Sequence, residues 1–469
     1  MNSRAGISIP EWITILVIAG LVAYLPAVWG VFTFDDYAWI LRNAGLDPRS
    51  FDFSLRRPVT MITFVANLQA GGTDPVGFHV VNIALHLANG ALVYLVVVRS
   101  LPRTPDAAAL AALGAAIFLL HPAQTGAVAY VSGRATSLMT FWLLVAHLAA
   151  LRSLESKSRA SMAVSLIAFV LAVGSKETAL VWPALWVAWL VFNEGIGFAR
   201  ALRIAGPSLA AALMMVAAML LHPGYRNLLD EGLHAPQLAA SPVGRIEQRL
   251  GLGFCFNQEQ ARDDSCIARR VESLSGLGRY LLSPRDISID PGRRSIGAAD
   301  WLAVMIAACA AWIALRTRPS AIAAGAAWVV VALLPTSLLV VRPDPVSDRL
   351  LYLPMVGIAL IAAAVPGRLG TPMARRLALA CGATIVLALA VLAWERNLQY
   401  TSETALWADA VAKNPRHARA HVNLAYALEN EGRFEHARSE YRAALELRPG
   451  LLWARRGLER IGAKHDGET

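Results

Sequence analysis

Eleven apolar blocks dominate the sequence, and each is long enough, or nearly so, to cross a lipid bilayer as a helix. A spanning helix needs about 20 mostly apolar residues, with a range of about 17 to 25. With 56% hydrophobic and 16% charged residues, the chain is neither an ordinary soluble globule nor disordered. We therefore predict an all-α polytopic membrane protein whose spans lie at residues 9–31, 79–99, 107–121, 137–151, 161–175, 178–193, 204–221, 300–315, 320–341, 352–366 and 377–394.

The distribution of Lys and Arg predicts the orientation. If the N-terminus is cytoplasmic, the short loops on its side carry thirteen Lys and Arg but only three Asp and Glu. Such an excess is typical of cytoplasmic loops. The net charge of these loops equals the net charge of the whole chain, +10. The positive charge of the chain therefore reflects its topology and gives no support to nucleic-acid binding. We expect residues 32–78, residues 222–299 and the segment after 394 to lie on the opposite, outer side.

The C-terminal segment differs in composition from the rest of the chain, with 12 basic and 11 acidic residues over 395–469. Pro415 and Pro449 lie 34 residues apart, which is the tetratricopeptide period. We therefore predict two domains: a membrane domain over 1–394 and a short external tetratricopeptide module over 395–469.

Two adjacent acids, Asp35 and Asp36, follow the first apolar block directly. Charges close to the hydrocarbon are costly, so this pair needs either a function or full solvation. Adjacent side chains diverge, so one could accept a proton from a hydroxyl while the other binds a divalent cation or orients a sugar. A solvated pair that caps a short helix explains the same residues, and the sequence leaves both readings open.

Several cations stand at the expected outer ends of the spans, against the positive-inside trend. A phosphate could compensate them, because Arg binds phosphate with two parallel hydrogen bonds. Each cation alone could be an interface anchor, but their occurrence in separate loops favours a shared anion site at the outer face. They are Arg56, Arg57, Arg134, Lys176 (followed by Glu177) and Arg349.

The second apolar block carries a polar stripe of His79, Asn82, His86 and Asn89 on one helical face. Interhelical hydrogen bonding is the favoured explanation. A substrate or metal role for His79 is the alternative. His121, before Pro122, ends the third block, where it either stops a helix or lines an outer cavity.

Cysteines occur in the long outer loop at Cys255 and Cys266. If that side is oxidising, we expect them to form a disulfide, the alternative being two unrelated thiols.

Taken in order along the chain, these residues resemble the multi-span O-mannosyltransferases that carry C-terminal tetratricopeptide repeats, within the GT-C glycosyltransferase fold. The chain departs from the family's pattern on both sides of Thr125, where the family has a His and a Glu and this chain has Gln124 and Gly126. It also departs at Thr136, where the family usually has an acid. The resemblance rests on Asp35-Asp36, Arg57-Pro58, Gly77-Phe78-His79, Leu85-His86, His121-Pro122, Gly133-Arg134-Ala135, Ser175-Lys176-Glu177, and Arg349 with Leu351-Tyr352-Leu353-Pro354.

The resemblance implies transfer of mannose or another hexose from a polyprenyl-phosphate sugar to a hydroxyl, with a protein Ser or Thr as the expected acceptor. Asp35 would be the general base, and Asp36 would assist, with or without a divalent cation (Mg²⁺ or Mn²⁺) that His79 could share. The cations above would bind the lipid phosphate, while His79, His121, Glu177 and Tyr352 would line the cavity.

In a bacterium the expected location is the inner membrane. The active face and the repeats would then be periplasmic, the donor would carry undecaprenyl, and the repeats could present the acceptor.

Two other classes of protein remain as alternatives. A non-catalytic scaffold could use the repeats to assemble envelope partners, but it would leave the outer cations without a shared task. A transporter would favour charges near mid-span and inverted repeats, whereas these charges stand at span ends. The sequence contains no Walker A loop, GxSxG or HExxH motif, so nucleotide-driven and hydrolase readings have no support.

Overall fold

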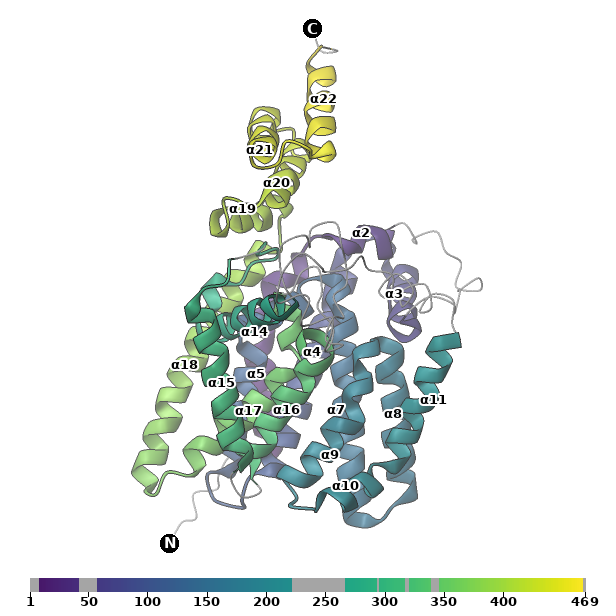
Figure 1. Cartoon of the computed structure of the whole chain (residues 1–469), viewed down its shortest axis with the longest axis vertical. Coiled ribbons are helices and arrows are strands. Elements are labelled where there is room, and N and C mark those ends of the chain that lie inside the picture. Colours follow the sequence, from purple (N-terminus) through teal and green to yellow (C-terminus); the bar gives the residue numbers. More distant parts are fainter. Residues whose placement is uncertain are drawn as a thin grey trace.

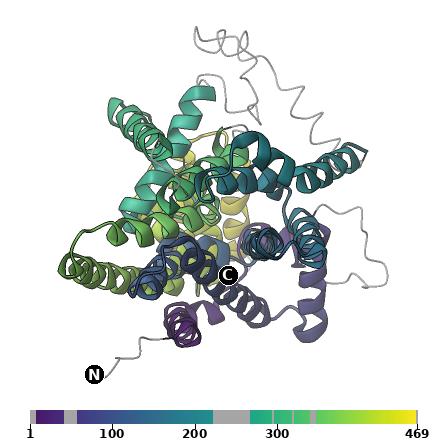
Figure 2. The same cartoon turned by 90° about the horizontal axis from the view of Figure 1, so that it is seen from below.

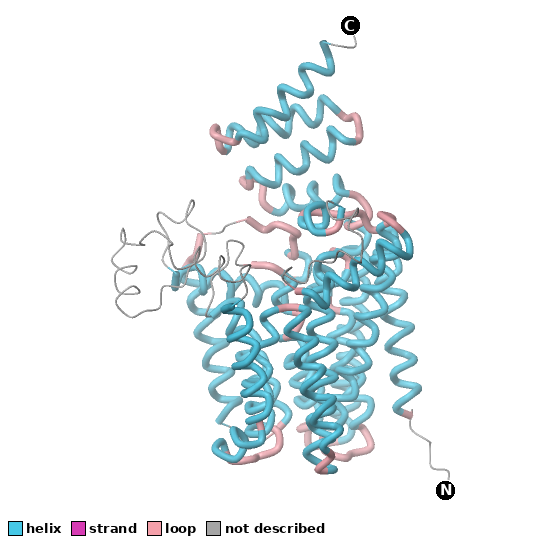
Figure 3. The backbone as a smooth tube through the Cα atoms, turned by 90° about the vertical axis from the view of Figure 1, so that its right-hand side faces the viewer, coloured by secondary structure: helices cyan, strands magenta, loops and turns pink. Residues whose placement is uncertain are grey.

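A computed structural model describes residues 8–41, 57–221, 266–292, 295–316, 320–338 and 346–466. Within these ranges all regular structure is helical and no strand occurs (Figure 3). The helices form an upright bundle and a smaller C-terminal group that stands on one end of it (Figure 1). We call this end the tail side.

The apolar blocks predicted from the sequence coincide with apolar helices of the bundle. Among the described residues, five helices are long and apolar enough to cross a membrane, or up to seven if each of two bent pairs is one span. The chain is therefore a multi-pass membrane protein, while the number of its spans stays a prediction. The five are α1 with its continuation η1 (Ile9–Tyr24, Leu25–Trp29), α4 (Pro75–Ser100), α7 (Arg134–Ser156, with the turn before it), α15 (Ala298–Arg316) and α18 (Pro372–Gln399).

The remaining bundle helices are bent or short. Two bent pairs have angles of 53° and 61° between their halves. They are α5 (Ala107–Leu120) with the turn that follows, and α10 (Phe198–Ile204) with α11 (Gly206–Leu221). The shorter apolar helices are α8 (Arg159–Ser175), α9 (Trp182–Phe192), α16 (Ala321–Leu333) and α17 (Pro354–Gly367).

Lipid-facing and protein-facing helices differ in their exposed side chains. The most apolar stretch of α15 has no buried residue, and Ile306 and Trp312 on it are 60% and 59% exposed. So large an apolar surface is unfavourable in water and is matched by lipid. By contrast, α16 and α17 touch closely at glycines: a Cβ on Gly325 would lie 2.6 Å from the Gly357 carbonyl oxygen. Small residues permit this approach of two helices inside a bilayer.

Short helices and turns cap the bundle on the tail side, where helices run into and out of the membrane region. The connecting segments put the predicted functional residues on this one side. They are α2 (Asp35–Trp39), α3 (Pro58–Gly71), η4 (Pro122–Gln124), α6 (Thr125–Val128), η5 (Val131–Gly133), η6 (Glu177–Val181), α14 (Cys266–Leu282), η7 (Pro284–Asp286) and η9 (Asp348–Leu351).

The tail consists of four amphipathic helices that pack consecutively: α19 (Glu403–Lys413), α20 (Ala418–Asn430), α21 (Phe434–Leu447) and α22 (Leu452–Asp466). They enclose a small core of their own, in which Leu424, Ala437 and Tyr441 are buried. Viewed from the opposite end, the tail lies behind the bundle rather than beside it (Figure 2). The assignment of these hairpins as tetratricopeptide repeats stays a prediction.

Candidate active site

The carboxylate of Asp36 is buried and fully engaged. One oxygen accepts a hydrogen bond from the Thr33 backbone N–H (3.0 Å), and the other accepts from the Ser132 backbone N–H (2.8 Å) and hydroxyl. Burial raises the pKa of Asp36 to about 7, although the bonds from Ser132 and Thr33 favour its charged form. Asp36 therefore fixes the start of α2 against η5.

Asp35 is exposed, in contrast to its neighbour. Its backbone N–H donates a hydrogen bond to the Tyr130 hydroxyl at 3.2 Å. This bond anchors the backbone and does not involve the carboxylate. The preceding residue, Phe34, has a left-handed backbone with φ of 47°. A non-glycine residue rarely adopts such a φ, and such strain often occurs at functional sites. The turn thus presents one acid to the tail side and buries the other.

Among the predicted cations that the structure describes, Arg349 is one that interacts with this exposed acid. Its guanidinium lies over the Tyr130 ring, 4.7 Å from the ring centre, and interacts electrostatically with Asp35. Its Nε donates a long hydrogen bond of 3.4 Å to the Ser347 hydroxyl. Among the described side chains, none forms an ion pair with it within 4.0 Å. Arg349 is therefore available to an anionic ligand beside Asp35.

Arg134 is fully buried at the start of α7 and already well bonded. Its Nε donates to Asn82 (2.6 Å), Nη1 to Asn67 (2.6 Å), and Nη2 to the Phe78 carbonyl (2.9 Å). Its guanidinium also lies 4.8 Å from the centre of the Phe64 ring, a cation–π contact. These bonds join α7 to α3 and α4, so Arg134 has a structural role in this conformation.

A second polar group lies where α3, α7 and η6 meet. Arg57 forms two parallel hydrogen bonds with Glu177, at 2.6 and 2.9 Å, and Lys176 donates to the Thr136 hydroxyl at 2.6 Å. The structure thus brings the three predicted residues of this group together. Thr136 is one of the three residues at which the chain departs from the pattern of the resembling family, and here its hydroxyl accepts a hydrogen bond from Lys176.

The polar stripe of α4 is buried and forms interhelical hydrogen bonds, as the sequence predicts. His86 bonds to the Tyr352 hydroxyl (2.8 Å) and the Leu119 carbonyl (2.9 Å), and Asn89 donates to the same hydroxyl (3.0 Å). Tyr352, expected in the cavity, therefore lies within this buried network.

His79 and His121 are also buried. The His79 ring packs against the backbone of Gly30, where a Cβ would lie 2.7 Å from the ring. His121 follows the last residue of α5, and its side chain accepts a hydrogen bond from the Ala123 backbone N–H at 3.1 Å, which caps the start of η4.

The divalent cation has no evident set of ligands in the described ranges. No group of three His, Cys, Asp or Glu side chains there could hold a metal ion. The Asp36 oxygens are occupied by hydrogen bonds, and His79 is packed against Gly30. Asp36 and His79 do not fit a metal site in this conformation.

Two predicted features lie outside what the structure describes. Arg56 and Cys255 fall in undescribed segments. Cys266 begins α14, but its side chain is not described, so the predicted disulfide stays a prediction.

Asp348 was not predicted as a site residue, yet its carboxylate is buried beside Arg349. A Cβ on Gly126 would lie 2.1 Å from one of its oxygens. Burial raises the pKa of Asp348, and Arg396 and Arg349 oppose that rise. Gly126 is another residue at which the chain departs from the pattern of the resembling family. Because Gly126 has no side chain, the Asp348 carboxylate has room beside it. The Asp348-Arg349 dipeptide was the available signal in the sequence.

The tail touches the Asp35-Asp36 turn directly. The Phe34 ring packs edge-on against Trp407 of α19, with ring centres 4.7 Å apart. Tyr37 of α2 is hydrogen-bonded to Glu403, the first residue of α19. No sequence signal tied Trp407 to the turn, because these residues lie far apart along the chain.

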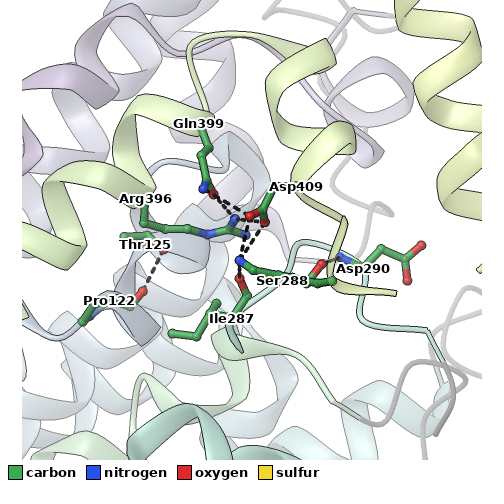
Figure 4. Close-up of polar contacts among 9 residues, drawn as sticks. Pro122, Thr125, Ile287, Ser288, Asp290, Arg396, Gln399 and Asp409 are labelled. Carbon is green, nitrogen blue, oxygen red and sulfur yellow. Dashed lines mark hydrogen bonds and ion pairs between the residues drawn. The ribbon is translucent and has the colours of Figure 1, made fainter. Parts of the chain in front are cut away.

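Ion pairs fasten the tail to the bundle at a second place. Arg396, at the end of α18, donates to Asp409 at 2.9 Å, and Gln399 joins the same group (Figure 4). Lys413 donates to the Ile287 carbonyl at 2.7 Å, beside them. Arg419 of α20 forms two hydrogen bonds with the buried Asp290, at 2.6 and 2.8 Å.

Comparison with known proteins finds relatives that share sequence with most of this chain. The chain is 24% identical to a protein O-mannosyl-transferase of Caenorhabditis elegans over 93% of its length, and 25% identical to human protein O-mannosyl-transferase TMTC1 over 90%. A shorter stretch of 171 residues is 33% identical to human TMTC4, over 30% of this chain and 23% of that protein. The chain is thus similar in sequence to protein O-mannosyl-transferases.

The likeness does not extend over the whole of these relatives. The chain covers 62% of the worm protein and 51% of human TMTC1. No family model matches it. Among solved structures, the crystal structure of ArnT from Cupriavidus metallidurans bound to undecaprenyl phosphate is a distant likeness. Its TM-score is 0.44, with 17% identity over 97% of this chain and 79% of that one.

Proposed function

We propose that the chain is an integral membrane glycosyltransferase, which moves mannose or another hexose from a polyprenyl-phosphate sugar to a protein Ser or Thr on the tail side. The observation that carries this proposal is that the exposed Asp35 interacts electrostatically with Arg349, while no described carboxylate forms an ion pair with Arg349 within 4.0 Å. The names of the related proteins support mannose as the sugar and protein as the acceptor.

The proposed reaction is a single displacement at the anomeric carbon of the sugar. The acceptor hydroxyl oxygen forms the new glycosidic bond while the bond from the anomeric carbon to the phosphate oxygen breaks. Asp35 takes the hydroxyl proton as general base. The electron pair of the broken bond leaves with the lipid phosphate, whose developing charge Arg349 meets.

The other residues are assigned supporting tasks in this scheme. Asp36 holds the turn that presents Asp35, and Tyr130 places Arg349 beside it through the ring contact. Lys176 adds positive charge on the same side of the membrane, beside the neutral Arg57–Glu177 pair, and we propose that Lys176 and Arg57 help to bind the lipid phosphate.

Orientation and location are part of the proposal. The excess of Lys and Arg lies in loops on the side opposite the tail, which supports a cytoplasmic N-terminus and a periplasmic tail if the source is bacterial. The donor lipid would then be undecaprenyl phosphate.

Glycan mass spectrometry of membrane and envelope proteins, from cells with and without the gene, tests the function. The proposal predicts hexose on Ser or Thr of at least one protein, absent when the gene is deleted and restored by the wild-type gene. An unchanged glycan profile, together with purified chain that neither binds nor consumes the lipid-linked sugar, would instead support the non-catalytic scaffold.

A further inference from the structure

A cavity with a volume of about 870 Å³ lies in the tail rather than at the Asp35-Asp36 turn. Its walls come from α20, α21 and α22 and from the 290–292 segment of the bundle. We call it the tail groove. Its basic members are Arg416, Arg419, Arg448 and Arg460, and its aromatic members are Tyr426, Tyr441 and Trp453.

The charge of the tail groove is one-sided. Four arginines line it, and Asp290 is the only carboxylate among its described lining residues. The tail as a whole is nearly neutral, with 12 basic and 11 acidic residues. The groove therefore holds an excess of positive charge, whereas most acidic residues of the tail lie outside it.

Two of the four arginines are already paired. Arg419 binds Asp290, and Arg460 binds Glu429 with two hydrogen bonds of 2.9 and 3.0 Å. Arg416 and Arg448 are exposed, and no side-chain partner is described for either. An anionic ligand could therefore bind both without breaking a bond of the fold.

The groove also exposes aromatic surface. Tyr426 is 50% exposed and Trp453 is 67% exposed. Exposed Tyr and Trp beside Arg form the residue set that dominates binding energy at protein interfaces.

The groove reaches toward the proposed catalytic turn. Tyr426 of α20 lines the groove, and Tyr37, which follows Asp36 directly, is hydrogen-bonded to Glu403 at the start of α19. Asn414, at the end of α19, lines the groove, while Trp407 in the middle of the same helix contacts Phe34. One helix thus joins the groove to the turn.

We propose that the tail groove binds a polypeptide segment rich in Asp and Glu, with Arg416 and Arg448 as its carboxylate ligands and Tyr426 and Trp453 as apolar contacts. This rests on the proposed function, because the segment would belong to the protein acceptor. The bound segment lies beside α19, so a neighbouring Ser or Thr is delivered toward Asp35.

The test measures peptide binding to the full chain in detergent by fluorescence anisotropy. The probe is a labelled peptide in which Glu alternates with Ser and Ala, and a matched peptide carries Lys in place of Glu. We expect binding of the Glu peptide only, weakened about tenfold or more in R416E/R448E. The control R442E reverses an exposed cation of α21 outside the groove and should bind within about twofold of wild type. Circular dichroism melting of each variant verifies that the tail is folded.

Several outcomes would overturn the proposal. They are equal binding of the two peptides, unchanged affinity in folded R416E/R448E, or groove-dependent binding of an anionic oligosaccharide, such as oligogalacturonate, without binding of the peptide. Asp35→Asn should bind the Glu peptide as wild type does. If the peptide binds in a groove-dependent manner but no sugar is transferred, the proposed function fails and the peptide site stands. If sugar is transferred but the Glu peptide does not bind, the proposed function stands and the peptide site fails.

Discussion

Asp35 and Asp36 are adjacent in the sequence but end in opposite environments. The sequence predicted that their side chains diverge, because neighbouring residues on a short helix point apart. It could not show which acid is buried, since the bonds that bury Asp36 come from Ser132, 96 residues further along the chain. The same long-range contact explains why Tyr130 and Ser132 escaped prediction.

Asp36 should make stability depend on pH. Its folded pKa of about 7 exceeds the ordinary value of 3.8, so the folded state binds its proton more tightly than the unfolded state does. This contribution, at most about 4 kcal/mol, is complete below about pH 4 and is lost as pH rises through 7. In melting experiments, wild type should lose stability relative to Asp36→Asn between pH 5 and 8, because Asn stays neutral. Parallel pH curves for the two proteins would contradict this assignment.

At the scale of elements, Arg57 and Glu177 tie α3 to η6, and both side chains are 34% exposed. The sequence placed both residues on the outer side but could not show that they pair with each other. The pairing predicts a coupling free energy of about 1 kcal/mol for this partly exposed, two-bond contact.

A double-mutant cycle of Arg57→Ala and Glu177→Ala checks the pairing by thermal melting. The single variants should each lose stability, and the double variant should lose less than their sum. Additive losses would show that the two side chains act independently.

The contact between α6 and η9 depends on the missing side chain at Gly126. A Cβ there would lie 2.1 Å from a carboxylate oxygen of Asp348, so the acid or the backbone must move. We expect Gly126→Ala to destabilise the protein by about 1–3 kcal/mol, as overpacking does. The double variant Gly126→Ala with Asp348→Ala should recover part of the loss. If Gly126→Ala alone melted at the same temperature as the wild type, the site would have room to relax around the added methyl group.

At the scale of the whole molecule, hydropathy predicted most of the architecture. Each of the eleven blocks contains an apolar helix, because twenty apolar residues in lipid have few other ways to satisfy their backbone. The tail was predicted as a separate helical segment from its composition. Its docking was not, since contacts such as Phe34–Trp407 and Arg419–Asp290 join residues far apart in the chain and show no periodicity.

Because the tail is docked on the bundle, we expect the loss of one ion pair between them to increase local opening in both the tail and the bundle segment that it contacts. Asp409→Asn leaves the Arg396 guanidinium, which is only 4% exposed, without its carboxylate, and uncompensated buried charge is strongly unfavourable. Hydrogen exchange should then accelerate in α19 and in residues 284–292. Glu446→Gln, an exposed change on α21, is the matched control. Exchange unchanged from wild type in Asp409→Asn would mean that the other contacts alone hold the tail.

The most direct test of the account is sugar transfer by the purified full chain, using radiolabelled mannosyl-phosphoryl-polyprenol and a Ser/Thr peptide. Three proteins are compared: wild type, Asp35→Asn, and Asp74→Asn, whose exposed carboxylate only caps α4 on the same side. Loss of a general base predicts at least about a hundredfold lower rate in Asp35→Asn, with Asp74→Asn unchanged. Transfer by well-folded Asp35→Asn at the wild-type rate would contradict the central assignment.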